Sequence, residues 1–152
     1  MPSMQLNAQE IELLSALNDC KAHYLIIGGH AVIFHGHLRQ AKDLDIWIEP
    51  TKENAQRVAR ALSTVRIFLQ PEHVERLAAP NLKMPIAHLC TELLTSVTGL
   101  EFSDAMKRSK TIFENGTPCR VLGLEDLLLS KRALGRESDL ADIAQLESKS
   151  RA

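Results

Sequence analysis

Two aspartates, Asp43 and Asp45, stand two residues apart in a segment that alternates between polar and apolar side chains. Residues i and i+2 of a strand lie on one face of a sheet, about 6.6–6.8 Å apart along the backbone. The alternation predicts a strand over 43–48 whose apolar residues fill the core face. Both carboxylates then lie side by side on the open face, together with Trp47.

Such a pair of acids carries an electrostatic cost, because each carboxylate disfavours ionisation of its neighbour. A divalent cation removes that cost, and oxygen ligands from two carboxylates suit Mg²⁺, which also takes phosphate oxygens from a substrate. With a third carboxylate, two ions about 3.5–4 Å apart could activate a hydroxyl and stabilise a leaving pyrophosphate. The alternative is a solvated strand face at the edge of the sheet, and the alternation alone does not decide between the two.

A pair of glycines, Gly28-Gly29, lies between an apolar run at 24–27 and a short helical segment at 30–35. Glycine permits positive φ and close approach of a phosphate, and a helix N-terminus offers free N–H groups to it. The alternative is a tight turn without a ligand, since the segment is neither a P-loop nor a dinucleotide-binding fingerprint. Thirteen residues separate Gly29 from Asp43, which places the turn close to the acidic strand in sequence.

The remaining pattern predicts the elements that position these residues. Helices are expected at 7–19, 30–35, 52–62 after the N-cap Thr51, 71–79, 102–108, 124–134 ending at Gly135, and from the cap Ser138 to 147. Strands are expected at 24–27, 43–48, 65–69 and 86–96 (a helix being the alternative for the last), with a loop at 80–85 and a hairpin of 110–114 and 117–122 around Asn115-Gly116. This order predicts a single α/β (α+β) domain over 1–152, with a small mixed sheet flanked by helices.

Composition sets the class of protein. Of the 152 residues, 45% are hydrophobic and 24% are charged, as in an ordinary soluble domain, and the net charge of −1 provides no basic field for nucleic acid. The three cysteines are widely spaced and odd in number, which indicates idle thiols rather than disulfides or a zinc site. With no signal peptide or apolar span in the sequence, we expect a cytoplasmic protein without a membrane partner.

The segment GGHAVIFHGHLRQAKDLDIWI (28–48) resembles the polymerase-β-like nucleotidyltransferase superfamily. That pattern has a hydrophobic residue, Gly and Gly or Ser, then Asp, a hydrophobic residue and Asp or Glu. The similarity is greatest to the small bacterial branch of AbiEii-type toxins and minimal nucleotidyltransferases. GLEDLLLSKRALGRESDLADIAQLE (123–147) is similar to the C-terminal helices of that branch, and the resemblance implies a nucleotidyltransferase fold.

The resemblance also implies roles for residues. Gly28 and Gly29 would seat the nucleotide phosphates, Asp43 and Asp45 would hold Mg²⁺, and Glu92 in TELLTSVTG stands where the third acid is expected. Lys131 would approach a phosphate, with Asp139 or Asp142 supporting the site. Three features depart from the pattern: Ala41 replaces a Thr or Ser, Glu92 replaces an Asp, and the lead-in IAHLC differs.

Two further residues are candidates by position. His30 follows the glycine turn, and Arg39 leads into the acidic strand, where a cation would neutralise a triphosphate. The alternatives are a surface or capping histidine and a solvated loop.

The expected function is transfer of a nucleoside monophosphate from an NTP, with two Mg²⁺ ions, onto a hydroxyl of RNA, protein or a small molecule. The resemblance implies acceptors such as tRNA or a partner protein, in a toxin–antitoxin or defence context. The rival hypotheses are a non-catalytic scaffold that binds nucleotide or a partner protein, and a plain α/β interaction module. The sequence leaves the oligomeric state open.

Overall fold

The structure is a computed structural model that describes residues 3–150. Its helices are α1 (Ala8–Asp19), α2 (Gly28–His35), α3 (Lys52–Thr64), α4 (Pro71–Arg76), the 3-10 helix η1 (Ala87–Leu89), α5 (Phe102–Lys107), α6 (Leu124–Leu134) and α7 (Glu137–Ser150). Its strands are β1 (Tyr24–Ile27), β2 (Leu44–Ile48), β3 (Lys83–Ile86), β4 (Thr91–Leu94), β5 (Lys110–Glu114) and β6 (Thr117–Val121).

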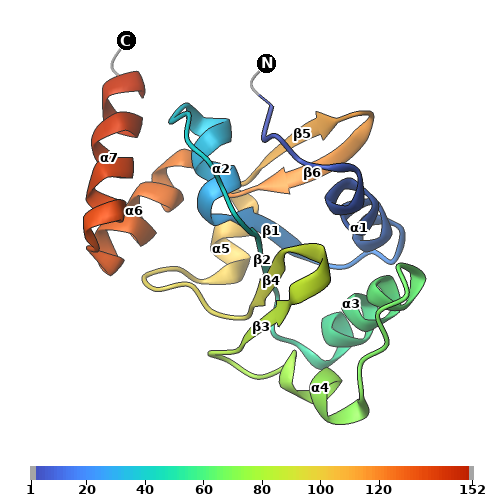
Figure 1. Cartoon of the computed structure of the whole chain (residues 1–152). Coiled ribbons are helices and arrows are strands. Elements are labelled where there is room, and N and C mark those ends of the chain that lie inside the picture. Colours follow the sequence, from blue (N-terminus) through green and yellow to red (C-terminus); the bar gives the residue numbers. More distant parts are fainter. Residues whose placement is uncertain (1–2, 151–152) are drawn as a thin grey trace.

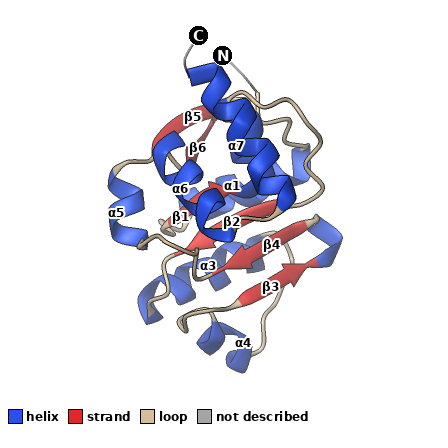
Figure 2. Cartoon of the chain, turned by 90° about the vertical axis from the view of Figure 1, so that its left-hand side faces the viewer, coloured by secondary structure: helices blue, strands red, loops and turns tan. Residues whose placement is uncertain are grey.

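The six strands form one mixed sheet in the order β3-β4-β2-β1-β6-β5. β2 lies at its centre, antiparallel to β1 and parallel to β4, and β1 pairs in parallel with β6. Figures 1 and 2 show α1 and α3 on one side of the sheet and α2, α6 and α7 on the other. The predicted fold class, a mixed sheet flanked by helices, is confirmed.

Local sequence explains why these elements form. β1 consists of four apolar residues and is buried throughout, as expected for a strand covered on both faces. In α1, Asn7 and Glu10 form a reciprocal capping box, with bonds of 2.8 and 2.9 Å. The hydroxyl of Thr51 accepts from the N–H of Asn54 at 3.1 Å and so caps α3, as predicted.

The β3 region corrects two sequence predictions. The expected loop at 80–85 contains β3, which forms an antiparallel edge strand on β4. Pro85 fits there because an edge strand tolerates a missing donor. The expected strand at 86–96 is continuous only over β4, because η1 and Cys90, at φ +47°, interrupt it.

Two other predictions are also wrong in part. The segment 65–69 is an irregular connection between α3 and α4 and pairs with no strand of the described chain. Arg66, at φ +69°, turns the chain out of the helix there. The last helix begins at Glu137, not after a Ser138 cap, and there the carboxylate of Asp139 accepts the main-chain N–H of Arg136 at 3.2 Å.

Trp47 does not lie on an open face as expected. Its side chain is 2% exposed and packs edge-on against Phe102 of α5, with ring centroids 5.1 Å apart. α5 therefore covers this part of the β2 face and leaves open only the part of the face around Asp45, at the start of β2.

No helix of the described residues is long and apolar enough to span a bilayer.

Candidate active site

Three carboxylates gather where β2 begins beside β4. Asp45 of β2 is in register with Glu92 of β4, so their side chains leave the same face of the sheet next to each other. Asp43 lies one residue before β2 and is exposed, whereas Asp45 and Glu92 are half-buried. The structure therefore brings together the three acids that were predicted as metal ligands.

The electrostatic environment of Asp45 is unfavourable to its charge. The pKa of Asp45 is raised from 3.8 to about 6, chiefly by burial and then by the neighbouring charges of Glu92 and Asp43. His30 and Lys83 act in the opposite direction and do not offset the rise. The cluster thus holds negative charge that the chain itself does not balance.

The glycine turn lies directly against this cluster. Ile27, the last residue of β1, is in register with Asp45, and Gly28 follows at φ +67°. A Cβ on Gly28 would collide with the carboxylate of Asp45, and one on Gly29 would stand 2.8 Å from the Cβ of Ala41. Both glycines are therefore required by close approach of the strand and loop beside them.

The turn also begins α2, two residues earlier than predicted. No side chain of the described chain caps this helix, so its first N–H groups have no side-chain acceptor. Free N–H groups at a helix start bind anions, because the helix dipole places positive charge there.

A network of ion pairs from α6 and α7 forms the opposite wall. The ammonium of Lys131 in α6 lies 3.1 Å from Asp139 and 2.9 Å from Asp142, both in α7. Arg136 donates to Asp139 at 2.6 Å, and Arg39 donates to Asp142 at 2.9 Å through Nε and at 3.2 Å through Nη2. The network ties α6, α7 and the loop before β2 into one unit.

The two aspartates of the network are stabilised as anions. Burial acts to raise the pKa of Asp139, but hydrogen bonds from Arg136 and Lys131 outweigh it and lower the pKa to about 2. Burial likewise acts to raise the pKa of Asp142, and hydrogen bonds from Lys131 and Arg39 lower it overall. These carboxylates hold the basic side chains in place. Their negative charge is balanced by neighbouring cations, unlike that of Asp45.

The acids, the glycine turn and the basic wall surround two adjoining cavities of about 560 and 270 Å³. Seven predicted site residues line the larger one: Gly28, Gly29, Arg39, Asp43, Asp45, Glu92 and Lys131. Both cavities also contact Lys83 and Arg136. Lys83 was missed because its strand was predicted as a loop, although Met84 and Ile86, two residues apart, have the spacing of a strand with one buried face. Arg136 was not predicted as a site residue.

Two predicted site residues do not line either cavity. His30 is 4% exposed, and its Nδ1 lies 2.7 Å from the main-chain oxygen of Met4, while its Nε2 has no hydrogen-bond partner. Asp139 is fully buried behind Lys131 and Arg136. Asp139 acts on the site through Lys131 and Arg136, whereas His30 acts to lower the pKa of Asp45.

The donor set fits a magnesium ion held partly by substrate. Among the described residues, no group of three His, Cys, Asp or Glu side chains is arranged to hold a metal ion by itself. Mg²⁺ is usually bound by one or two carboxylates together with water and substrate phosphates. The oxygen ligands of the acid cluster, and the raised pKa of Asp45, suit that mode of binding.

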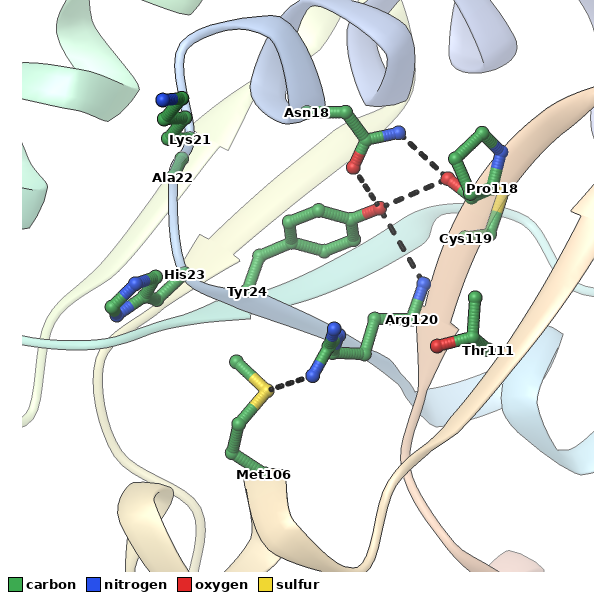
Figure 3. A pocket seen from close by; sticks show the side chains of 10 residues that line it. All are labelled: Asn18, Lys21, Ala22, His23, Tyr24, Met106, Thr111, Pro118, Cys119 and Arg120. Carbon is green, nitrogen blue, oxygen red and sulfur yellow. Dashed lines mark hydrogen bonds between the residues drawn. The ribbon is translucent and has the colours of Figure 1, made fainter.

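A third cavity, of about 430 Å³, lies at the far end of β1, away from Gly28 (Figure 3). The hydroxyl of Tyr24 in this cavity donates to Asn18 at 3.0 Å and receives the N–H of Arg120 at 3.4 Å. Burial raises the pKa of Tyr24. The hydroxyl is thus a neutral group that is engaged in holding α1 to β6, not a reactive one.

No family model matches the chain, and comparison with curated proteins finds no match. The chemistry of the acid cluster and its surroundings is therefore the basis for a functional conclusion.

Proposed function

We propose that this chain is a Mg²⁺-dependent nucleotidyltransferase, which moves a nucleoside monophosphate from an NTP onto a hydroxyl and releases pyrophosphate. The supporting observation is the pairing of Asp45 with Glu92 across β2 and β4, with a glycine turn and a basic wall around the same cavity. Phosphoryl transfer requires mainly positioning and charge neutralisation, and these groups supply both.

Asp43, Asp45 and Glu92 are the residues that would hold Mg²⁺. When bound, the ion would neutralise phosphate charge and increase the acidity of the acceptor hydroxyl. The raised pKa of Asp45 supports this assignment, since an approaching cation would offset the burial and the repulsion that raise it.

The other residues bind and orient the triphosphate. The N–H groups at Gly28 and Gly29 donate to phosphate oxygens, and Lys131 and Arg39 bring positive charge to the opposite wall. Asp142 positions both cations, because its carboxylate contacts each of them. Loss of Asp142 would change the distance between Lys131 and the phosphates. Asp142 acts in this way through Lys131, so it is a positioning residue.

In the reaction, the acceptor oxygen forms a bond to the α-phosphorus, and the bond from that phosphorus to the bridging oxygen of the β-phosphate breaks. The electron pair of the broken bond leaves with pyrophosphate. The hydroxyl proton passes to a carboxylate at the mouth of the cavity, for which Glu92 and Asp43 are the candidates.

The test is label transfer with purified protein, Mg²⁺ and each of the four α-labelled NTPs, incubated with total RNA and with lysate protein. We expect label on RNA or on a protein band, and we expect its loss in Asp43→Asn/Asp45→Asn. Asp104→Asn in α5 is the matched control, because this exposed aspartate lies outside the residues that line the two cavities. Transfer that survives the double substitution would refute the assignment.

A second candidate function is nucleotide binding without transfer. The ammonium of Lys83 lies 3.7 Å from Glu92, so a protein cation already offsets part of the charge of the third acid. In that case the same samples would show Mg²⁺-dependent nucleotide binding, absent from Asp43→Asn/Asp45→Asn, with no labelled acceptor.

A further inference from the structure

One edge of the sheet is open. β5 is the outermost strand beside β6, as Figure 1 shows for the hairpin that it forms with β6. The opposite edge strand, β3, contains Pro85, which has no N–H to offer a further strand. β5 contains no proline, and its side chains at Lys110, Thr111 and Phe113 are exposed.

The main-chain groups that point outward from β5 can be identified. The N–H of Leu122 donates to the main-chain oxygen of Ile26 in β1 at 3.0 Å. The N–H of Arg120 donates to the side-chain hydroxyl of Tyr24, also in β1. Alternate residues of a strand direct their main-chain groups to opposite sides, so Cys119 and Val121 face β5. Their register partners, Ile112 and Lys110, therefore face β6.

The intervening residues, Thr111 and Phe113, direct their N–H and C=O groups to the open edge. In the described chain no strand lies beyond β5, and no main-chain hydrogen bond joins either residue to another element. Unpaired groups of this kind form a template for another strand.

We propose that β5 pairs antiparallel with β5 of a second copy of this chain, about a twofold axis at Ile112. In this register, Thr111 of each copy lies opposite Phe113 of the other, and the two residues exchange N–H···O=C bonds. Four main-chain hydrogen bonds form, and the two copies make one continuous sheet. An interface of this kind is self-complementary, as twofold symmetry requires.

The charges of β5 are complementary in the same register. Lys110 of each copy lies opposite Glu114 of the other, so both ends of the paired strands carry an opposite-charge pair. Within its own chain the carboxylate of Glu114 also accepts the main-chain N–H of Met4 at 2.7 Å, a bond that leaves its negative charge in place. A parallel arrangement would instead place each charge beside its own kind. The sequence KTIFE thus favours the antiparallel dimer over the alternative pairing.

The exposed ring of Phe113 also finds a contact in this arrangement. Its side chain is 70% exposed in the single chain. In the dimer it lies across from Thr111, which lines the cavity of Figure 3 together with Met106 and Arg120. The ring therefore packs at the rim of that cavity, in place of exposure to water.

The experiment is the molar mass of the full chain in solution, measured by light scattering during gel filtration over a wide range of concentration. We expect a mass approaching twice 16.9 kDa at high concentration. Lys110→Glu and Glu114→Lys each place two like-charge pairs in the homodimer, so the dissociation constant of each variant alone should rise tenfold or more. Glu114→Lys also removes the acceptor of the Met4 N–H, so circular dichroism should first show that this variant is folded. An equimolar mixture of the two variants should form a heterodimer, because both of its pairs are opposite in charge.

Two further variants separate loss of pairing from loss of fold. Thr111→Pro removes an outward N–H without removing a bond to β6, and it should leave a folded single chain by circular dichroism. Lys107→Glu makes the same charge change on an exposed lysine of α5 and should leave the dimer intact. A wild type of single-chain mass at every concentration, a Thr111→Pro dimer, or a variant mixture that does not associate would each overturn the proposal.

Discussion

Replacement of Asp45 by Asn is expected to make the protein more stable and inactive. The carboxylate of Asp45 accepts no hydrogen bond in the described chain that an amide would lose, and Asn has nearly the same shape. The substitution removes a half-buried charge from beside Glu92 and Asp43, both of which raise the pKa of Asp45. Stability gained on removal of a charge would show that the charge is retained for function and not for folding.

The magnitude follows from the pKa. A rise from 3.8 to about 6 corresponds to about 3 kcal/mol of unfavourable interaction with the ionised carboxylate. Because Asp45 is partly open to solvent, screening reduces this value, and we expect a gain of about 1–2 kcal/mol for Asp45→Asn at pH 8.

The sign of the pH dependence is fixed. The pKa of Asp45 is higher in the folded than in the unfolded chain, so between pH 4 and pH 6 the folded protein binds more protons. The penalty of the wild type is therefore absent below about pH 4, develops between pH 4 and 6, and is complete above pH 6. The advantage of Asp45→Asn should follow the same course.

The assay is urea unfolding followed by the fluorescence of Trp47, the only tryptophan and almost fully buried. Wild type and Asp45→Asn are compared at pH 8 and pH 4.5, with and without Mg²⁺. At ten times its dissociation constant, Mg²⁺ should stabilise the wild type by about 1.4 kcal/mol and should leave Asp45→Asn unchanged. Equal stability at pH 8, or a difference independent of pH, would refute the reasoning.

Three further outcomes are expected. Gly28→Ala should lose about 1–2 kcal/mol in urea unfolding, since the residue has φ +67° and its Cβ would meet a carboxylate; unchanged stability would mean that the turn relaxes. Asp142→Ala should lose about 3 kcal/mol in the same assay, because it leaves Lys131 short of a buried partner, and Asp142→Asn should lose less. Burial raises the pKa of Cys119 to about 11, so a thiol reagent at pH 8 should modify exposed Cys90 first, and Cys119 only on unfolding; mass spectrometry would detect any early reaction of Cys119.

Local signals in the sequence predicted the fold well wherever one residue type decides the conformation. Asn115 and Gly116 have φ +50° and +80°, as the hairpin turn requires, and the strands on both sides were predicted. Gly135, at φ +64°, ends α6 at the predicted residue. In these places the backbone requirement can be read without knowledge of the neighbours.

Prediction failed where tertiary contacts decide. Cys90 takes a left-handed conformation that its residue type does not indicate, so the break between β3 and β4 was invisible in the sequence. The position of Trp47 depends on Phe102, more than fifty residues later in the chain. Of the basic wall, Lys131 was predicted only through the resemblance and Arg39 only by its position before the acidic strand. Their association could not be predicted, because they meet at Asp142 and not along the sequence.

The two kinds of carboxylate around the cavity differ in what their charge accomplishes. Asp139 has its pKa lowered to about 2, so its ionised form stabilises the fold above pH 4, and that stability is lost as the pH falls toward 2. Asp45 shows the opposite dependence, because its ionised form destabilises the fold above pH 6. Two cations balance Asp139, whereas Asp45 lies beside two further acids. The unbalanced negative charge of the chain therefore lies in the cavity, where a cation can reach it. The cavity thus presents unbalanced negative charge at Asp45 and positive charge at Lys131, which is the arrangement that the proposed metal–phosphate complex requires.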